Sequence, residues 1–265
     1  MSGHISVENV RKIYQTGKDS VEAVSGASFV ANDGEFVAIL GPSGCGKSTL
    51  LMMCGGLESI TSGKITIGGT PVTGPRASVG VMFQDSTLLP WKTVRENILF
   101  PARIQHRTLQ DVGPRADELI ELVGLGGFAD KKPHQLSGGM RQRVAICRAL
   151  VTDPDILLMD EPFSALDAMT RDEMNDALLD IWDKYRKTGL FVTHSIREAV
   201  YLADRVLVMT RRPATVVADV RIPFGRDRDQ SISSTPEFTE LCAYLRNMID
   251  QERIPGRSVR RVKAA

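Results

Sequence analysis

The sequence has no apolar run that approaches the roughly 20 residues needed to cross a membrane. Its polar start, M-S-G-H-I-S, leads us to expect no secretory signal peptide. The 33 lysines and arginines nearly balance 32 aspartates and glutamates, so a net charge of +1 gives no bulk electrostatic reason to bind nucleic acid. The chain contains no internal repeat and no low-complexity tract. Any membrane association is therefore expected to come through a partner.

Cysteine is also scarce. The four cysteines Cys45, Cys54, Cys147 and Cys242 show no C-x-x-C spacing, so we expect free thiols in a reducing cytosol. Apolar residues, in contrast, make up 42% of the 265 residues. A chain of this length can bury one large core and a small subdomain.

A glycine-rich loop follows the apolar run E-F-V-A-I-L at 35–40, which predicts a buried strand, and a helical pattern resumes at 47–53. Glycines let successive backbone N–H groups turn inward at a helix N-terminus, where phosphate is favoured. We expect Lys47 to reach the β- and γ-phosphates of ATP and Ser48 to bind Mg²⁺. A glycine-rich turn without this function is the alternative. The predicted nucleotide-binding residues here are Gly41, Pro42, Ser43, Gly44, Cys45, Gly46, Lys47, Ser48 and Thr49.

Two carboxylates end another continuous apolar run. The run I-L-L-M at 156–159 predicts a central parallel strand, and Asp160 and Glu161 follow it. Ligands of open α/β sheets lie at the carboxyl ends of the strands. We expect Asp160 to hold Mg²⁺ and Glu161 to orient and deprotonate the attacking water. Acidic residues that cap a helix, with Pro162 next in sequence, are the alternative.

The sequence L-S-G-G-M at 136–140 predicts a second anion-binding helix start. Ser137 is a good N-cap, and Gly138 and Gly139 leave backbone N–H groups uncovered ahead of the amphipathic pattern at 140–150. The first glycine-rich loop already covers one side of a triphosphate. The natural ligand of this second helix start is therefore the γ-phosphate bound by a neighbouring copy. An ordinary capped helix is the alternative.

Three further residues have positions that suit a nucleotide. His194 follows the strand-like run at 190–193, and Gln84 follows V-G-V-M-F at 79–83, so both sit at the carboxyl ends of strands. Tyr14 lies in a short polar stretch. Its ring suits stacking on a base, although a lone aromatic residue in such a stretch also serves as core or surface filler.

Together these motifs resemble, over about residues 4–220, the nucleotide-binding subunits of ATP-binding cassette (ABC) transporters. The resemblance implies that Tyr14 stacks on adenine and that His194 contacts the γ-phosphate. It also implies that Gln84 senses Mg²⁺, which places Gln84 beside Ser48 and Asp160 among the predicted metal contacts. The sequence S-A-L-D at 164–167 would span a dimer interface. The predicted catalytic residues are Glu161, His194, Gln84 and Lys47.

The expected fold is α/β, with a P-loop NTPase core built on a mostly parallel sheet, an antiparallel β region and an inserted helical subdomain. We assign residues 1–84 and 155–225 to the nucleotide-binding core and 85–154 to the helical subdomain that carries the L-S-G-G-M sequence. Residues 226–265 form a C-terminal helix, expected at 236–252, and a basic tail. The tail is expected to be solvated, or to touch anionic lipid.

The segment L-L-P-W at 88–91 exposes unusual apolar surface for a linker, which commonly marks a partner site. Packing of this segment on its own subdomain is the alternative. The resemblance implies that transmembrane permease subunits dock near Gln84 to Trp91. The sequences at 83–91 and 193–206 further resemble the importers of nitrate, taurine and aliphatic sulfonates.

We therefore expect an ATP-hydrolysing importer subunit, peripheral on the cytoplasmic face of the cell (inner) membrane. It would form a head-to-tail homodimer around two Mg²⁺-ATP and serve a solute-binding protein indirectly. A soluble ABC ATPase, such as a cluster-assembly factor, is the alternative.

Because Cys45 lies at a helix N-terminus beside Lys47, we also expect its thiolate to be favoured and reactive.

Overall fold

The computed structural model describes residues 3–17, 19–164, 166–225 and 227–253. A six-stranded sheet has the order β10-β9-β3-β8-β7-β6, in which β9 and β10 are antiparallel and the other neighbours are parallel. Its strands are β3 (Phe36–Leu40), β6 (Val79–Met82), β7 (Ile156–Asp160), β8 (Thr188–Val192), β9 (Arg205–Met209) and β10 (Val216–Arg221). Every residue of β3, β7 and β8 is buried, as expected for central parallel strands.

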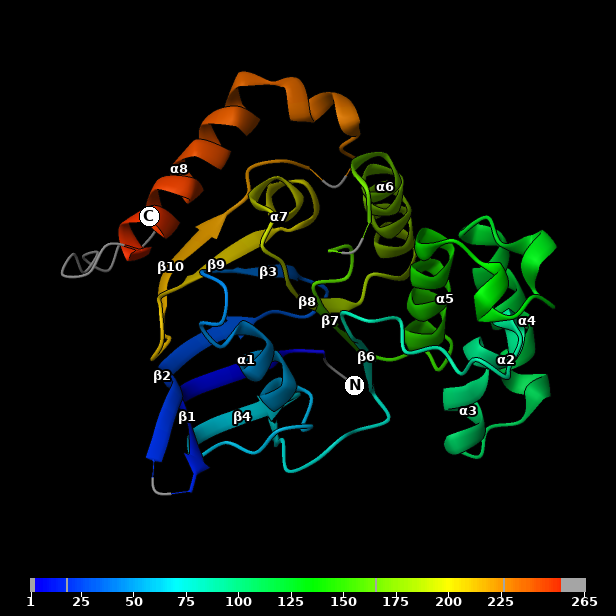
Figure 1. Cartoon of the computed structure of the whole chain (residues 1–265), viewed down its shortest axis with the longest axis horizontal. Helices are drawn as coiled ribbons and strands as arrows, with labels where there is room; N and C mark the ends of the chain where they lie inside the picture. Colours follow the sequence, from blue (N-terminus) through cyan, green and yellow to red (C-terminus); the bar gives the residue numbers. More distant parts are fainter. Residues whose placement is uncertain (1–2, 18, 165, 226, 254–265) are drawn as a thin grey trace.

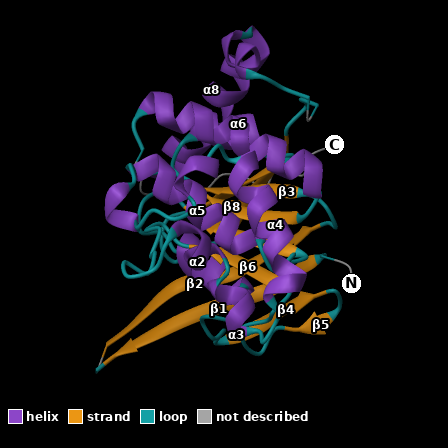
Figure 2. Ribbon diagram, turned by 90° about the vertical axis from the view of Figure 1, so that its right-hand side faces the viewer, coloured by secondary structure: helices purple, strands orange, loops and turns teal. Residues whose placement is uncertain are grey.

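A four-stranded antiparallel sheet stands beside it, in the order β2-β1-β4-β5. Its strands are β1 (Ile5–Thr16), β2 (Asp19–Ala31), β4 (Ser62–Ile67) and β5 (Thr70–Pro71). Figure 2 shows the strands of both sheets with the helices packed around them. This sheet is the antiparallel β region expected from the sequence.

Most of the helices gather at one side of the six-stranded sheet and at its β6 end (Figure 1). The structure contains α1 (Lys47–Cys54), α2 (Val94–Ile98), α3 (Phe100–Ile104), α4 (Leu109–Leu122), α5 (Gly138–Leu150), α6 (Ala168–Tyr185), α7 (Ile196–Leu202) and α8 (Pro236–Arg253). Short 3₁₀ turns are η1 (Gly126–Phe128), η2 (Pro133–Gln135) and η3 (Gln230–Ser234). The α/β fold class predicted from the sequence is confirmed.

The two faces of the six-stranded sheet bury different elements, because successive side chains of a strand point to opposite faces. Along β3, Phe36 and Ala38 join a core formed with α5, α6, α7 and α8. Val37 and Ile39 join a second core formed with α1 and the four-stranded sheet. Phe36 stacks on Trp182 of α6 with ring centroids 4.2 Å apart. The central strands thus lie between two packed layers, one on each face of the sheet.

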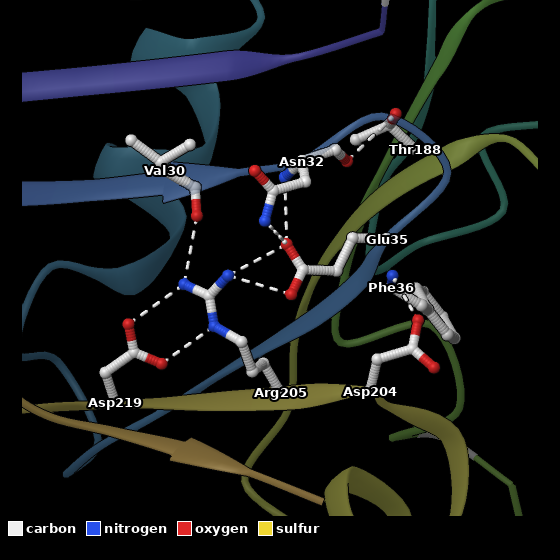
Figure 3. Close-up of polar contacts among 8 residues, drawn as sticks. All are labelled: Val30, Asn32, Glu35, Phe36, Thr188, Asp204, Arg205 and Asp219. Carbon is white, nitrogen blue, oxygen red and sulfur yellow. Dashed lines mark hydrogen bonds and ion pairs between the residues drawn. The ribbon is translucent and has the colours of Figure 1, made fainter. Parts of the chain in front are cut away.

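A partly buried polar cluster fixes the amino end of β3 relative to its neighbours (Figure 3). Arg205 of β9 donates to both carboxylate oxygens of Glu35 at 2.8 Å and to Asp219 of β10 at 2.8 and 2.9 Å. Asp204 accepts from the backbone N–H of Phe36 at 2.9 Å. Because its amino end is held in this way, the carboxyl end of β3 lies at a defined place in the sheet.

The C-terminal helix α8 extends one residue beyond the predicted range of 236–252. Its buried side chains Phe238, Leu245, Met248 and Ile249 belong to the core that also contains α7. Among the described residues, no helix has both the length and the apolar character that a membrane crossing requires. The predicted basic tail lies outside the described residues.

Candidate nucleotide site

The loop between β3 and α1 has the backbone shape that a phosphate cradle needs. Gly44 and Gly46 have φ of 69° and 124°, a region that favours glycine. A Cβ at Gly46 would lie 2.9 Å from the carbonyl oxygen of Ala23. No side chain caps the start of α1 among the described residues, so its first N–H groups are left for a ligand.

Lys47 turns back over this loop. Its Nζ donates to the carbonyl oxygens of Gly41 and Pro42, each at 3.0 Å. The side chain is buried, so the ammonium group is held where an anion would enter the loop. Arg212, from the segment between β9 and β10, donates to the carbonyl oxygen of Gly44 at 2.7 Å. Nothing in the local sequence around Arg212 indicated this contact.

Ser48 and Asp160 meet at the carboxyl ends of their strands. Ser48 follows β3 and donates through Oγ to Oδ1 of Asp160 at 2.8 Å. Burial, assisted by the negative charge of Glu161, raises the pKa of Asp160. Two oxygen groups side by side in a partly dry setting are the ligand type that Mg²⁺ prefers. The predicted pair is therefore brought together.

Glu161 and His194 form the next pair along the same edge. Nδ1 of His194 lies 3.3 Å from Oε2 of Glu161. Glu161 has a φ of 44°, uncommon for a residue with a side chain, and its N–H donates to the carbonyl oxygen of Val192 in β8. Strained backbone of this kind clusters at functional sites. At Glu161 this backbone conformation changes the direction in which the carboxylate points as the chain leaves β7.

Gln84 connects the β6 end of the sheet to two other segments. Its Nε2 lies 3.4 Å from Oγ of Ser164, and its carbonyl oxygen accepts from Nε2 of Gln142 at 3.1 Å. Gln142 belongs to α5 and is buried. Ser164 and Gln142 are far from Gln84 in sequence, so periodicity does not reveal these contacts. The bonds join the predicted Mg²⁺-sensing glutamine to the helix that begins at Ser137.

The second helix start has the predicted cap. Ser137 accepts from the N–H of Met140 at 3.2 Å, and α5 begins at Gly138. A Cβ at Gly139 would lie 2.5 Å from Cγ2 of Thr170, so α6 approaches closely there. Figure 1 shows α5 and α1 well apart. Within the described part of one chain, the two predicted phosphate-binding helices therefore lie apart.

Two motif residues have mainly local contacts here. Asp167 caps α6 by accepting from the N–H of Thr170 at 3.1 Å; its neighbour Ala165 in the S-A-L-D sequence lies outside the described residues. Tyr14 is 36% exposed, its hydroxyl donates to Glu58 at 3.3 Å, and Nζ of Lys12 lies 4.8 Å from its ring centroid.

The segment that carries Trp91 has a firmly held backbone, and its Leu88 packs against the core while the side chain of Trp91 stays exposed. Arg148 of α5 donates to the carbonyl oxygens of Ser86 and Thr87 at 2.7 and 2.9 Å. Asn97 of α2, fully buried, accepts from the N–H of Leu89 at 2.7 Å and donates to three carbonyl oxygens of this segment. Trp91 is nevertheless 67% exposed.

Comparison with known proteins identifies the fold around this site. The family description "ABC transporter" matches residues 24–164, more than half of the chain. The chain belongs to the ABC transporter family. A solved ABC cassette dimer in a post-hydrolysis state, bound to ADP and Pi, superposes with a TM-score of 0.73 at 32% identity, covering 83% of this chain and all of that one. This ABC protein is accordingly an ATPase cassette.

Its curated relatives are ABC transporter ATP-binding proteins. An uncharacterised one from Methanocaldococcus jannaschii is 45% identical over 95% of this chain and 93% of its own. The taurine import ATP-binding protein TauB of Rhizobium johnstonii is 46% identical over 87% and 90%. The bicarbonate transport ATP-binding protein CmpD of Synechocystis is 42% identical over 91% and 86%. The predicted resemblance to the nitrate, sulfonate and taurine group is confirmed.

The expectation of a reactive Cys45 thiolate is wrong. Cys45 is 2% exposed, and burial raises the pKa of its thiol by more than the positive charges of Lys47 and Arg212 lower it. The sequence places Cys45 beside Lys47 and a helix start, but it does not show that the side chain turns inward. The thiol packs in the core with α1 and the four-stranded sheet.

Native Cys45 should consequently be alkylated more slowly than Cys242, which is only partly buried. Digestion and mass spectrometry after a timed exposure to iodoacetamide at neutral pH would measure both sites in one sample. A urea-unfolded sample serves as control, and there the two rates should converge. Labelling of native Cys45 ahead of Cys242 would contradict the burial argument.

Proposed function

We propose that this chain is the ATP-hydrolysing subunit of an ABC importer, which dimerises head-to-tail around two Mg²⁺-ATP and drives uptake of a small anion. The observation that carries the proposal is the single edge of the sheet at which Lys47, Ser48, Asp160, Glu161 and His194 converge. The edge provides a phosphate cradle, oxygen ligands and a carboxylate positioned by a histidine. These are the parts that phosphoryl transfer to water needs.

The residues present fit a magnesium ion. Ser48 and Asp160 already share a hydrogen bond, and the Gln84 amide stands at the adjoining strand end. The Ser48 hydroxyl and the Asp160 carboxylate are hard oxygen groups, the type that retains Mg²⁺ beside substrate phosphates. When bound, the ion would neutralise charge on the β- and γ-phosphates. Ser48, Asp160 and Gln84 are the proposed residues that hold or sense it.

In the proposed hydrolysis, Glu161 orients a water molecule and takes its proton as the water oxygen bonds to the γ-phosphorus. The bond from that phosphorus to the β–γ bridging oxygen breaks, which gives ADP and phosphate. Lys47 leaves its two carbonyl partners and contacts the β- and γ-phosphates. His194 holds the Glu161 carboxylate and contacts the γ-phosphate. The exposed ring of Tyr14 stacks on adenine.

A second copy completes each site in this proposal. The start of α5 at Ser137 is built for an anion but lies well apart from α1 in the same chain (Figure 1). In a head-to-tail dimer it closes on the γ-phosphate held by the partner's loop. The dimeric state of the solved cassettes at 32% identity supports this arrangement.

Permease subunits are the proposed partners of the segment from Gln84 to Trp91. Its backbone is fixed by Arg148 and Asn97, yet Phe83 and Trp91 are 39% and 67% exposed. A rigid backbone that presents exposed aromatic side chains is typical of an interface anchor. The proposed location is therefore peripheral, on the cytoplasmic face of the membrane. Relatives named for taurine import and bicarbonate transport support a small anion as the cargo, received from a solute-binding protein.

Glu161→Gln preserves the size of the side chain and its hydrogen bonding but removes the base. Turnover should fall by about 100-fold or more while ATP binding persists. ATP should then accumulate between two subunits, and size-exclusion chromatography with Mg²⁺ and ATP should show a dimer. Glu118→Gln, at an exposed position of α4, is the control and should keep wild-type turnover. A Glu161→Gln protein that hydrolyses ATP normally, or stays monomeric with ATP, would contradict the proposal.

Trp91→Ala should separate docking from catalysis. In cells that express the chain with its own transporter, the variant should move from the membrane pellet to the soluble fraction. The purified variant should retain ATP hydrolysis, because Trp91 lies outside the nucleotide site. Tyr244→Ala, which trims an exposed aromatic of α8, is the control. A wild-type protein found only in the soluble fraction would favour the non-transport ABC ATPase instead.

A further inference from the structure

A buried glutamate outside the predicted site lies directly behind the turn that carries His194. Glu198, in the first turn of α7, is 5% exposed, and its Oε2 accepts from Oγ1 of Thr193 at 2.8 Å. The hydroxyl of Thr193 in turn accepts from the N–H of Ser195 at 3.0 Å. One residue on each side of His194 is therefore tied to the same short chain of hydrogen bonds.

The backbone of this turn is held from two more directions. The N–H of Glu198 donates to Oγ of Ser195 at 3.3 Å, which caps α7. The N–H of Thr193 donates to the carbonyl oxygen of Ile39, the penultimate residue of β3, at 3.3 Å. Glu198 thus links the helix behind the turn to the strand that leads into the phosphate loop. Figure 1 shows α7 between the sheet and α8, a setting that restrains its movement.

Burial of this carboxyl group lowers the stability of the fold, and packing alone does not explain why a carboxyl group is buried here. Oε1 of Glu198 is buried and meets no hydrogen-bond donor among the described residues. The residue Glu198 lines a cavity of about 360 Å³ with Arg171, Asp172 and Asn175 of α6, Arg197 and Tyr201 of α7, and η3. A buried polar group with half of its acceptor capacity unused destabilises the fold. The other oxygen, Oε2, is the one that accepts from Thr193.

We infer that Glu198 is a positioning residue, which acts through Thr193 to hold the imidazole of His194 against Glu161 and the γ-phosphate. The side chain of His194 is 53% exposed, and its Nδ1 approaches Oε2 of Glu161 at 3.3 Å. Its own side chain is therefore weakly restrained, and the backbone of the turn sets its position. This inference rests on the proposed role of His194 in hydrolysis.

The contact with Thr193 does not require a charged glutamate. Burial raises the pKa of Glu198 to about 7, against the opposing effects of the Thr193 hydrogen bond and Arg171. The neutral acid keeps a carbonyl oxygen that accepts from the threonine hydroxyl. Glutamine offers the same acceptor without the charge. Glu198→Gln should accordingly preserve the position of His194.

Steady-state ATP hydrolysis by the full chain tests the inference. Glu198→Ala and Thr193→Val each remove the hydrogen bond between the two side chains, and kcat should fall about 10-fold, the scale expected for a small misplacement. KM for ATP should change less than about twofold, because neither side chain lies in the phosphate loop. Glu198→Gln should restore kcat. Asn175→Ala, which removes another buried polar group from the same cavity, is the control and should leave kcat unchanged.

A double-mutant cycle with His194→Ala then separates this inference from the proposed function. Adding Glu198→Ala to His194→Ala should lower kcat by less than a further twofold, since the group being positioned is already gone. Wild-type kcat for Glu198→Ala and Thr193→Val, or a full 10-fold loss in the His194→Ala background, would overturn the inference alone. Wild-type turnover by His194→Ala would instead overturn the proposed role of His194. Thermal unfolding confirms which variants are folded, and Thr193→Val keeps the test decisive if Glu198→Ala does not fold.

Discussion

The parallel register of β3, β8 and β7 is the constraint on which the rest of the structure depends. Parallel strands end at the same edge of a sheet, so residues near those ends meet although 112 positions separate one pair and 33 the other. Ser48 contacts Asp160 for this reason, and Glu161 contacts His194. Two apolar cores, one on each face, hold the strands in that register. Arg205 and Asp204 fix the other end of β3.

The contacts among the described residues of one chain do not explain two features of this architecture. The start of α5 has a serine cap, and α5 lies well apart from α1, which follows the phosphate loop, among the described residues of the chain. Trp91 stays exposed on a segment that Arg148 and Asn97 make rigid. Both features have a physical explanation if the chain works between neighbours, one a second copy and the other a membrane subunit. Catalysis then depends on the first of these surfaces, and docking to the membrane subunit depends on the second.

Local sequence patterns predicted β3, β6, β7 and β8, the residues at their carboxyl ends and the C-terminal helix, because periodicity and glycine placement act over a few residues. Contacts between distant segments were not predictable in this way. Gln142 beneath Gln84, Arg212 on the phosphate loop and Glu198 behind Thr193 each depend on how separate elements pack. Cys45 shows the converse error: its neighbours in sequence favour a thiolate, whereas burial raises the pKa of its thiol.

The central claim, that each active site is built from two chains, is tested most directly by ATP hydrolysis in covalently linked dimers. Lys47→Ala damages the phosphate loop, and Ser137→Arg blocks the opposing helix start. With both changes in one subunit, shared sites each carry one lesion; with one change in each subunit, one site carries both and the other is intact. The account predicts faster hydrolysis by the second arrangement, measured with the same linker. Faster hydrolysis by the first arrangement would contradict it, because a complete site would then lie within one wild-type chain.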